Sequence, residues 1–381
     1  MSKVPTREAL LHLLYEAAEL EHTLMCTYLY ALFSLKTGEE LAGCSEAEAA
    51  AVARWRQVIL KVSVEEMGHL ASVWNITAAL GGAPHFGRGN FPIDAGYLPA
   101  NIVVRLAPFS AEALQHFIHL ERPVASDERD GDGFAPELAF HRGTTSDRIT
   151  PMAIDYATVG AFYATLGDGL QAFAAHHGEA ATFCGDPALQ LSAAETVLGG
   201  KPVVCAKTAL AAFSAIVEQG EGAPAHSEGS HFAQFVAIRD ELLALRAANP
   251  AFEPAFPAAH NPVLRSPPRP QGKVWIEDET AAATVDVANT GYALMLRLLA
   301  HAYAVPRPAP DKALAIDLAV GLMRAITPLA ERAARLPAGP SSPGIHAGMS
   351  FTTLREAGAV PVASAGRFFV ERLGELVRYA T

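Results

Sequence analysis

The sequence has few charged residues, few aromatic residues and few cysteines for its length. Of its 381 residues, 18% are charged and 8% are aromatic, whereas 50% are hydrophobic. A chain of this size and composition can bury one large core or two smaller ones. Alanine recurs in long periodic runs, which is typical of a soluble, mostly helical globular protein.

Clusters of lysine and arginine are missing, and so are long uninterrupted apolar runs. The formal net charge of −11 argues against nucleic acid or an anionic membrane surface as a main partner. Charged residues or glycines interrupt the most apolar stretches before they reach the length of a membrane span. We therefore expect neither nucleic acid nor a membrane among the partners.

Signals for secretion and for disulfide formation are also missing. The first ten residues, MSKVPTREAL, have neither the apolar core nor the cleavage site of a signal peptide. The four cysteines show no spacing typical of a metal site or of a disulfide framework; they are Cys26, Cys44, Cys184 and Cys205. These observations predict a protein of the reducing cytoplasm.

Apolar periodicity predicts an all-α chain whose first part is a bundle of four long helices. Two helices follow one another closely, a long crossover with a small helix comes next, and a second pair completes the set. This order is the connectivity of a ferritin-like four-helix bundle with one crossover. The predicted segments are 6–36, 45–80, the crossover 81–150, 151–177, and 206–219 resuming at 231–248.

Local signals predict where these helices begin. Thr6 is a candidate N-cap for the first helix, and Ser45 with Glu48 forms a capping box for the second. For the third helix, Thr150 is the expected cap because Pro151 suits the first helical position.

The composition changes after the predicted bundle, which we place at 1–249. A Pro-rich linker at 250–272 follows, and its prolines predict a stiff, extended segment. The remainder, 273–381, is predicted to be a helical extension packed on the bundle. Its expected helices lie near 280–304, 311–336 and 363–379.

The stretch 64–73, VEEMGHLASV, carries two polar residues on an apolar helical face. Glu66 and His69 are three residues apart, so both side chains leave the same side of the helix. Placing a carboxylate and an imidazole on such a stripe is costly unless something pairs with them. In a helix bundle the usual partner of a Glu-x-x-His pair is a metal ion. The alternative is a buried ion pair with a neighbouring arginine.

Other helices provide matching ligand candidates on their inward faces. Glu21 lies on the apolar stripe of the first helix, Glu218 on the fourth, and His231 just after the break in the fourth. Glu221 is an alternative to Glu218, while Glu65 is less well placed than its neighbour Glu66. The predicted metal ligands are Glu21, Glu66, His69, Glu218 and His231.

The third predicted helix has no glutamate where a metal would lie. Ala161 occupies that position, and the nearest acids are Asp155 and Asp168. Three carboxylates and two imidazoles predict one well-held metal, or two with water completing the coordination. Tyr28 and Tyr163 are near these positions, although aromatic residues at helical spacing are more often core.

Several runs resemble the ferritin-like proteins grouped with the iminophenyl-pyruvate dimer synthases of bisindole biosynthesis. The resemblance covers most of the chain and implies a ferritin-like bundle with the ligand candidates named above. The family's third-helix pattern resembles G-E-F-Y, whereas this chain has alanine in the second place, Gly160-Ala161-Phe162-Tyr163. The similar runs are ELEHTLMCTYLYALFSLK (19–36), EEMGHLASVWNITAALGGAPHFGRGNFP (65–92), IVEQGEG…SHFAQF (216–235), FEPAFPAAHNP (252–262) and GYALMLRLLAHAY (291–303).

Mixed carboxylate and imidazole ligands in an apolar pocket favour iron, with manganese as an alternative, and leave open positions for O₂. We therefore expect an O₂-dependent oxidoreductase, monomeric or homodimeric, that acts on a small metabolite. The resemblance implies amino-acid-derived imines or aromatic metabolites as substrates. The alternatives are a metal-storage protein, or a structural protein whose metal site is degenerate.

Overall fold

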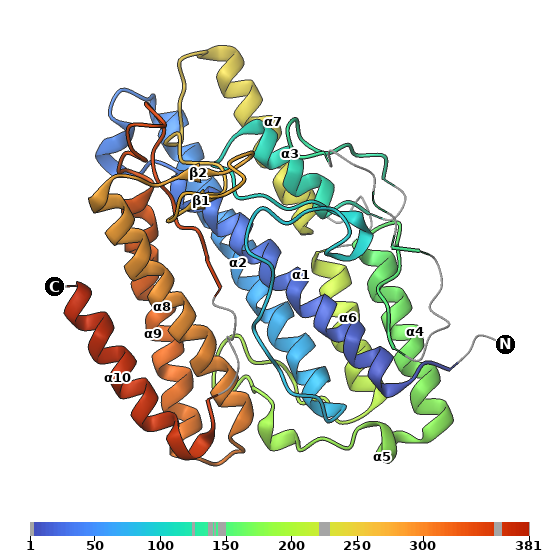
Figure 1. The fold of residues 1–381 in the computed structure, drawn as a ribbon. Helices are drawn as coiled ribbons and strands as arrows, with labels where there is room; N and C mark the ends of the chain where they lie inside the picture. Colours follow the sequence, from blue (N-terminus) through green and yellow to red (C-terminus); the bar gives the residue numbers. More distant parts are fainter. Residues whose placement is uncertain are drawn as a thin grey trace.

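The computed structural model describes residues 4–123, 126–135, 140, 142–143, 150–220, 229–353 and 360–380. Its centre is a pair of long helices, α1 (Arg7–Ser34) and α2 (Glu46–Ala79), which pack along one another (Figure 1). Both begin where the sequence predicts. The Thr6 hydroxyl accepts a hydrogen bond from the Ala9 amide, and Ser45 forms the expected capping box with Glu48.

Shorter helices complete the bundle in two packed pairs. α3 (Ala111–Leu120) packs on α7 (His231–Ala248), and α4 (Val159–His177) packs on α6 (Ala206–Gln219), as Figure 1 shows beside α1 and α2. The predicted crossover therefore contributes a helix, α3, that packs beside α7. The all-α ferritin-like architecture predicted from the sequence is confirmed.

The third predicted helix begins later than expected. The prediction of a helix from residue 151 with Thr150 as its cap is wrong, because α4 begins at Val159. The Thr158 hydroxyl accepts a hydrogen bond from the Ala161 amide at 3.2 Å. This side chain satisfies an amide of the first turn, so Thr158 is the N-cap. Ala161 therefore lies in the first turn of α4 and not in the middle of a helix.

The C-terminal part adds three long helices to the bundle. α8 (Glu279–Ala304) packs on α9 (Pro310–Ala333), and α10 (Val362–Ala380) packs on α8. Before them, β1 (Pro262–Val263) pairs in parallel with β2 (Val274–Trp275). One cluster of buried hydrophobic side chains extends from the N-terminal end of α1 to α10, so bundle and extension share a core. The remaining short helices are Gly38–Leu41, Pro99–Asn101, Glu179–Thr182 and Pro187–Leu189.

Among the described helices, α9 alone has the length and composition of a membrane span. Only 33% of its most apolar window is buried in the structure. The core helix of a soluble protein passes the same test, and α9 packs against α8.

Candidate metal centre

Two helices bring the first half of the centre together. Glu21 on α1 and Glu66 on α2 are fully buried, and the imidazole of His69 lies between them. Nδ1 of His69 is 3.0 Å from Oε2 of Glu66 and 3.4 Å from Oε2 of Glu21. Ligand atoms of the three residues lie within 4.8 Å of one another, close enough to share one metal ion.

A second group lies on the other side of Glu66. Nδ1 of His231, at the start of α7, is 2.8 Å from Oε1 of Glu66 and 3.6 Å from Oε1 of Glu121. These three residues also have ligand atoms within 4.8 Å of one another. The two oxygens of Glu66 thus face different imidazoles, and each imidazole has a further carboxylate of its own.

Glu121 is the residue that sequence reasoning missed. It directly follows α3 in the crossover, and its side chain is fully buried. The third predicted helix has Ala161 where this carboxylate was expected, and the structure supplies the carboxylate from another segment. A signal was present: Glu121 continues the apolar stripe of Leu114, Phe117 and Ile118 at helical spacing.

The structure does not bring Glu218 into the centre. This residue is exposed on α6, and its neighbour Gln219 contacts His69 instead, with Oε1 3.0 Å from Nε2. The alternative Glu221 lies outside the described residues. Asp168 is exposed on α4, and Asp155 lies before that helix, where it accepts a hydrogen bond from the Arg142 amide at 2.9 Å.

Each imidazole is also contacted on its outer nitrogen. Nε2 of His231 is 3.2 Å from Oε2 of Glu65, and Nε2 of His69 faces the Gln219 side-chain oxygen. Metal-binding histidines usually donate their second ring N–H to such an oxygen, which fixes the orientation of the ring. Both rings therefore present Nδ1 to the carboxylates. The sequence placed Glu65 less well than Glu66 as a metal ligand. In the structure Glu65 instead orients the His231 ring through its outer nitrogen.

Two tyrosines orient Glu21 and Glu121, the outer carboxylates on either side of Glu66. The hydroxyl of Tyr163 on α4 donates a hydrogen bond to Oε1 of Glu21, and the hydroxyl of Tyr28 on α1 donates one to Oε1 of Glu121. Both tyrosines are buried, as expected of core residues. The structure adds that each one orients a carboxylate of the centre.

The first part of the chain matches a family model. Residues 14–240 match the family described as ferritin-like. The chain belongs to the ferritin-like family. A crystal structure of a ferritin-like protein from Caulobacter vibrioides is similar with a TM-score of 0.53 and 17% identity. The similarity covers 86% of this chain and 98% of that one, and at this identity it shows the fold alone.

Two characterised relatives match almost the whole ferritin-like chain. Dichlorochromopyrrolate synthase of Lentzea aerocolonigenes is 28% identical over 96% of this chain. The 2-imino-3-(indol-3-yl)propanoate dimerase of Chromobacterium violaceum is 27% identical over 90% of it. The resemblance noted in the sequence is thereby confirmed. Both relatives are much longer, because the match covers 38% of the first and 34% of the second.

The protonation of the ferritin-like centre follows from burial and mutual contact. Burial raises the pKa of Glu21 to about 8. It also opposes the charge on Glu66, but His69 and His231 outweigh that effect and hold the pKa of Glu66 well below its usual range. Burial would lower the pKa of both imidazoles, yet the carboxylates around them, Glu66 foremost, raise both well above normal.

The donor atoms fit metal ions. Oε2 of Glu121 is buried without a hydrogen-bond partner among the described residues. Oε2 of Glu21 and Oε1 of Glu66 are buried against the imidazoles alone, 3.4 Å from Nδ1 of His69 and 2.8 Å from Nδ1 of His231. Buried carboxylate oxygens without partners are costly, and cations placed between them would remove that cost. Three carboxylates and two imidazoles form a mixed oxygen and nitrogen set that suits iron or manganese.

Proposed function

We propose that this chain is a ferritin-like oxidoreductase that holds two iron ions and uses O₂ to act on a small, amino-acid-derived metabolite. The observation that carries the proposal is the position of Glu66. Its two oxygens lie in two separate ligand groups, one completed by Glu21 and His69 and the other by Glu121 and His231. A carboxylate shared in this way suits a pair of metal ions.

The bound iron would supply open coordination positions at which O₂ can react. The residues of the chain hold and orient the ions. Glu65 and Gln219 fix the two imidazoles, and Tyr28 and Tyr163 fix the two outer carboxylates. Burial of the ligands keeps bulk water away, which strengthens the electrostatic interactions at the site. Manganese would satisfy the same ligands.

The substrate proposal rests on the relatives. One is a dimerase of 2-imino-3-(indol-3-yl)propanoate and the other a synthase of dichlorochromopyrrolate. We therefore propose an imine derived from an aromatic amino acid as the substrate class. The chain spans only about a third of the length of these relatives.

Two other functions agree less well with the arrangement of the residues. A degenerate metal site rested mainly on Ala161, and Glu121 supplies the carboxylate that Ala161 lacks, which supports an intact centre. Metal storage would leave the large C-terminal extension without a role. We expect a monomer or homodimer in size-exclusion chromatography, whereas a storage cage would elute as a much larger particle.

The proposal is tested by oxygen uptake. The chain is loaded with iron(II) and given indole-3-pyruvate with ammonium, which form the imine in solution. We expect O₂ consumption that requires iron and substrate and that Glu66→Ala abolishes. Glu218→Ala is the matched control and retains the rate, because Glu218 is exposed outside the centre. Equal uptake by the wild type and Glu66→Ala, or less than ~0.2 iron per chain, overturns the proposal.

A further inference from the structure

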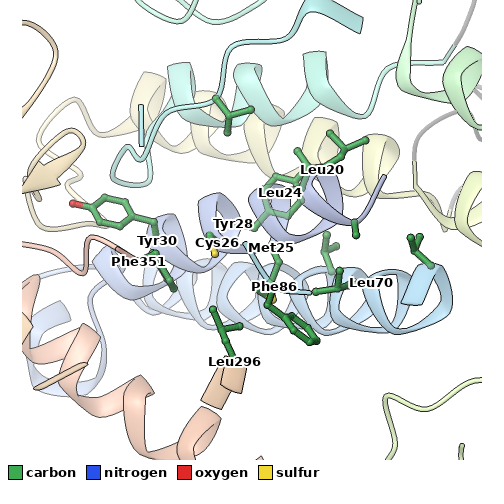
Figure 2. Close-up of a cluster of buried hydrophobic side chains, with 14 of the residues drawn as sticks. Leu20, Leu24, Met25, Cys26, Tyr28, Tyr30, Leu70, Phe86, Leu296 and Phe351 are labelled. Atoms are coloured by element: carbon green, nitrogen blue, oxygen red, sulfur yellow. The ribbon is translucent and has the colours of Figure 1, made fainter. Parts of the chain in front are cut away.

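An apolar cavity lies between the bundle and the C-terminal helices. Its volume is about 40 Å³, and its walls come mainly from α1 and α2 on one side and α8 and α9 on the other. Figure 2 shows Met25, Leu70, Phe86 and Leu296 gathered in this region. Four of the seven methionines of the chain line it: Met25, Met67, Met295 and Met323.

Most polar groups in the cavity wall form hydrogen bonds with other residues of the chain. Nε2 of His22 is hydrogen-bonded to the hydroxyl of Tyr292, and the hydroxyl of Tyr303 donates to the Ala71 carbonyl at 3.2 Å. Nε1 of Trp74 is the buried donor of this wall that has no partner among the described residues. A buried water usually needs two to four polar partners, so one donor does not hold it. The cavity is suited to an apolar occupant.

The volume of the cavity limits the size of an occupant. A cavity of about 150 Å³ accommodates benzene, and one of about 10–15 Å³ accommodates a single water. At about 40 Å³ this space is too small for an indole ring and large enough for a diatomic molecule. Methionine side chains adapt their shape to a small guest, because they are unbranched and flexible.

The cavity and the metal centre draw residues from the same two helices, α1 and α2. Met25 lies one turn after Glu21 on α1, and Met67 directly follows Glu66 on α2. Leu70, which directly follows His69, also lines the cavity. We propose that this cavity binds dioxygen, between the C-terminal helices and the two helices that carry Glu21, Glu66 and His69. The inference deepens the proposed oxidoreductase function and rests on it for its purpose, but binding of the gas can be measured without metal or substrate.

Methyl NMR of the metal-free chain under oxygen pressure tests the binding. Dioxygen is paramagnetic and increases the relaxation of nearby nuclei, so ¹³C-methyl-methionine labelling reports directly on the cavity. The chain provides internal controls: Met349 is 1% exposed but outside the cavity, and Met152 is 47% exposed to solvent. We expect a several-fold larger relaxation enhancement at the four cavity methionines than at Met349 and Met152. Enhancements no larger than at Met349 overturn the proposal.

A variant in which a larger side chain fills the cavity provides a second test of oxygen binding. Ala71 lines the cavity, and Ala71→Val adds two methyl groups to its wall. Ala313→Val is the matched control, because Ala313 is exposed on α9. We expect Ala71→Val to remove the enhancement and Ala313→Val to retain it; equal enhancement in both variants contradicts the assignment. If Ala71→Val does not fold, the comparison of the cavity methionines with Met349 in the wild type still shows whether the cavity binds oxygen.

The experiments distinguish failure of the oxidoreductase function from failure of the oxygen-binding cavity. Oxygen-induced relaxation at the cavity methionines, together with no O₂ uptake by the iron-loaded chain, overturns the oxidoreductase function and leaves the gas site intact. Uptake of O₂ without any enhancement at these methyl groups supports the enzyme and overturns the cavity as its oxygen site.

Discussion

The hydroxyl of Tyr28 on α1 donates a hydrogen bond to Oε1 of Glu121 at 2.5 Å, across 93 residues of sequence. This contact ties the crossover to the first helix and holds the Glu121 carboxylate beside His231. Tyr163 makes the equivalent contact with Glu21. The centre therefore has two outer carboxylates, each oriented by a phenol, on either side of the shared Glu66.

Glu121→Gln should lower the iron content of the reconstituted chain from about two ions to about one. The substitution keeps the size of the side chain but removes a charged ligand from the group around His231. Elemental analysis after removal of free iron measures the effect. Glu218→Gln should retain the wild-type content. Equal iron in the wild type and Glu121→Gln contradicts the assignment of Glu121.

Glu65→Ala should weaken metal binding by about 10–100-fold, because the His231 ring loses the oxygen that orients it. Competition with a chelator measures the affinity. Lys61→Ala is the control, since Lys61 pairs with Glu65 at 3.5 Å and removing it leaves the contact with His231 in place. If both variants bind metal equally well, Glu65 has no orienting role.

Tyr163→Phe should destabilise the metal-free chain by about 1–3 kcal/mol, because Glu21 stays buried without its hydroxyl donor. Urea unfolding measures the loss. The same substitution at Tyr379, which is 82% exposed, should change little. Equal stabilities of the Tyr163 and Tyr379 variants argue that the hydrogen bond to Glu21 contributes nothing.

The free energy of unfolding should increase with pH between about 8 and 10.5 because of Lys312. Its ammonium is buried against the Leu189 and Ala302 carbonyls, and burial lowers its pKa from 10.5 to about 8, with Glu195 opposing the shift. The folded state then binds fewer protons than the unfolded state in this window, so raising the pH favours folding.

Lys312→Met tests this by urea unfolding at several pH values. The stability of the wild type relative to the variant should rise from pH 8 to pH 10.5, the ordinary value of the side chain. Lys201→Met, at an exposed position, should show no such trend. A difference between the wild type and Lys312→Met that does not change with pH excludes a lowered pKa at Lys312.

The sequence by itself determined the helices and half of the centre. Apolar periodicity and capping residues are local, so α1, α2, α6 and α7 lie within a few residues of their predicted bounds. Glu66 and His69 are adjacent on one helical face because of their spacing alone. The inward positions of Glu21 and His231 followed from the apolar stripes that contain them.

Only the tertiary structure decided which segments complete the centre. Glu121 reaches it because α3 packs on α7, a contact between distant segments that no local pattern encodes. Glu218 is excluded because the last turn of α6 directs Gln219 to His69 and leaves Glu218 in solvent. Spacing within one helix determines which residues share a face. The packing of helices distant in sequence determines which of those faces meet.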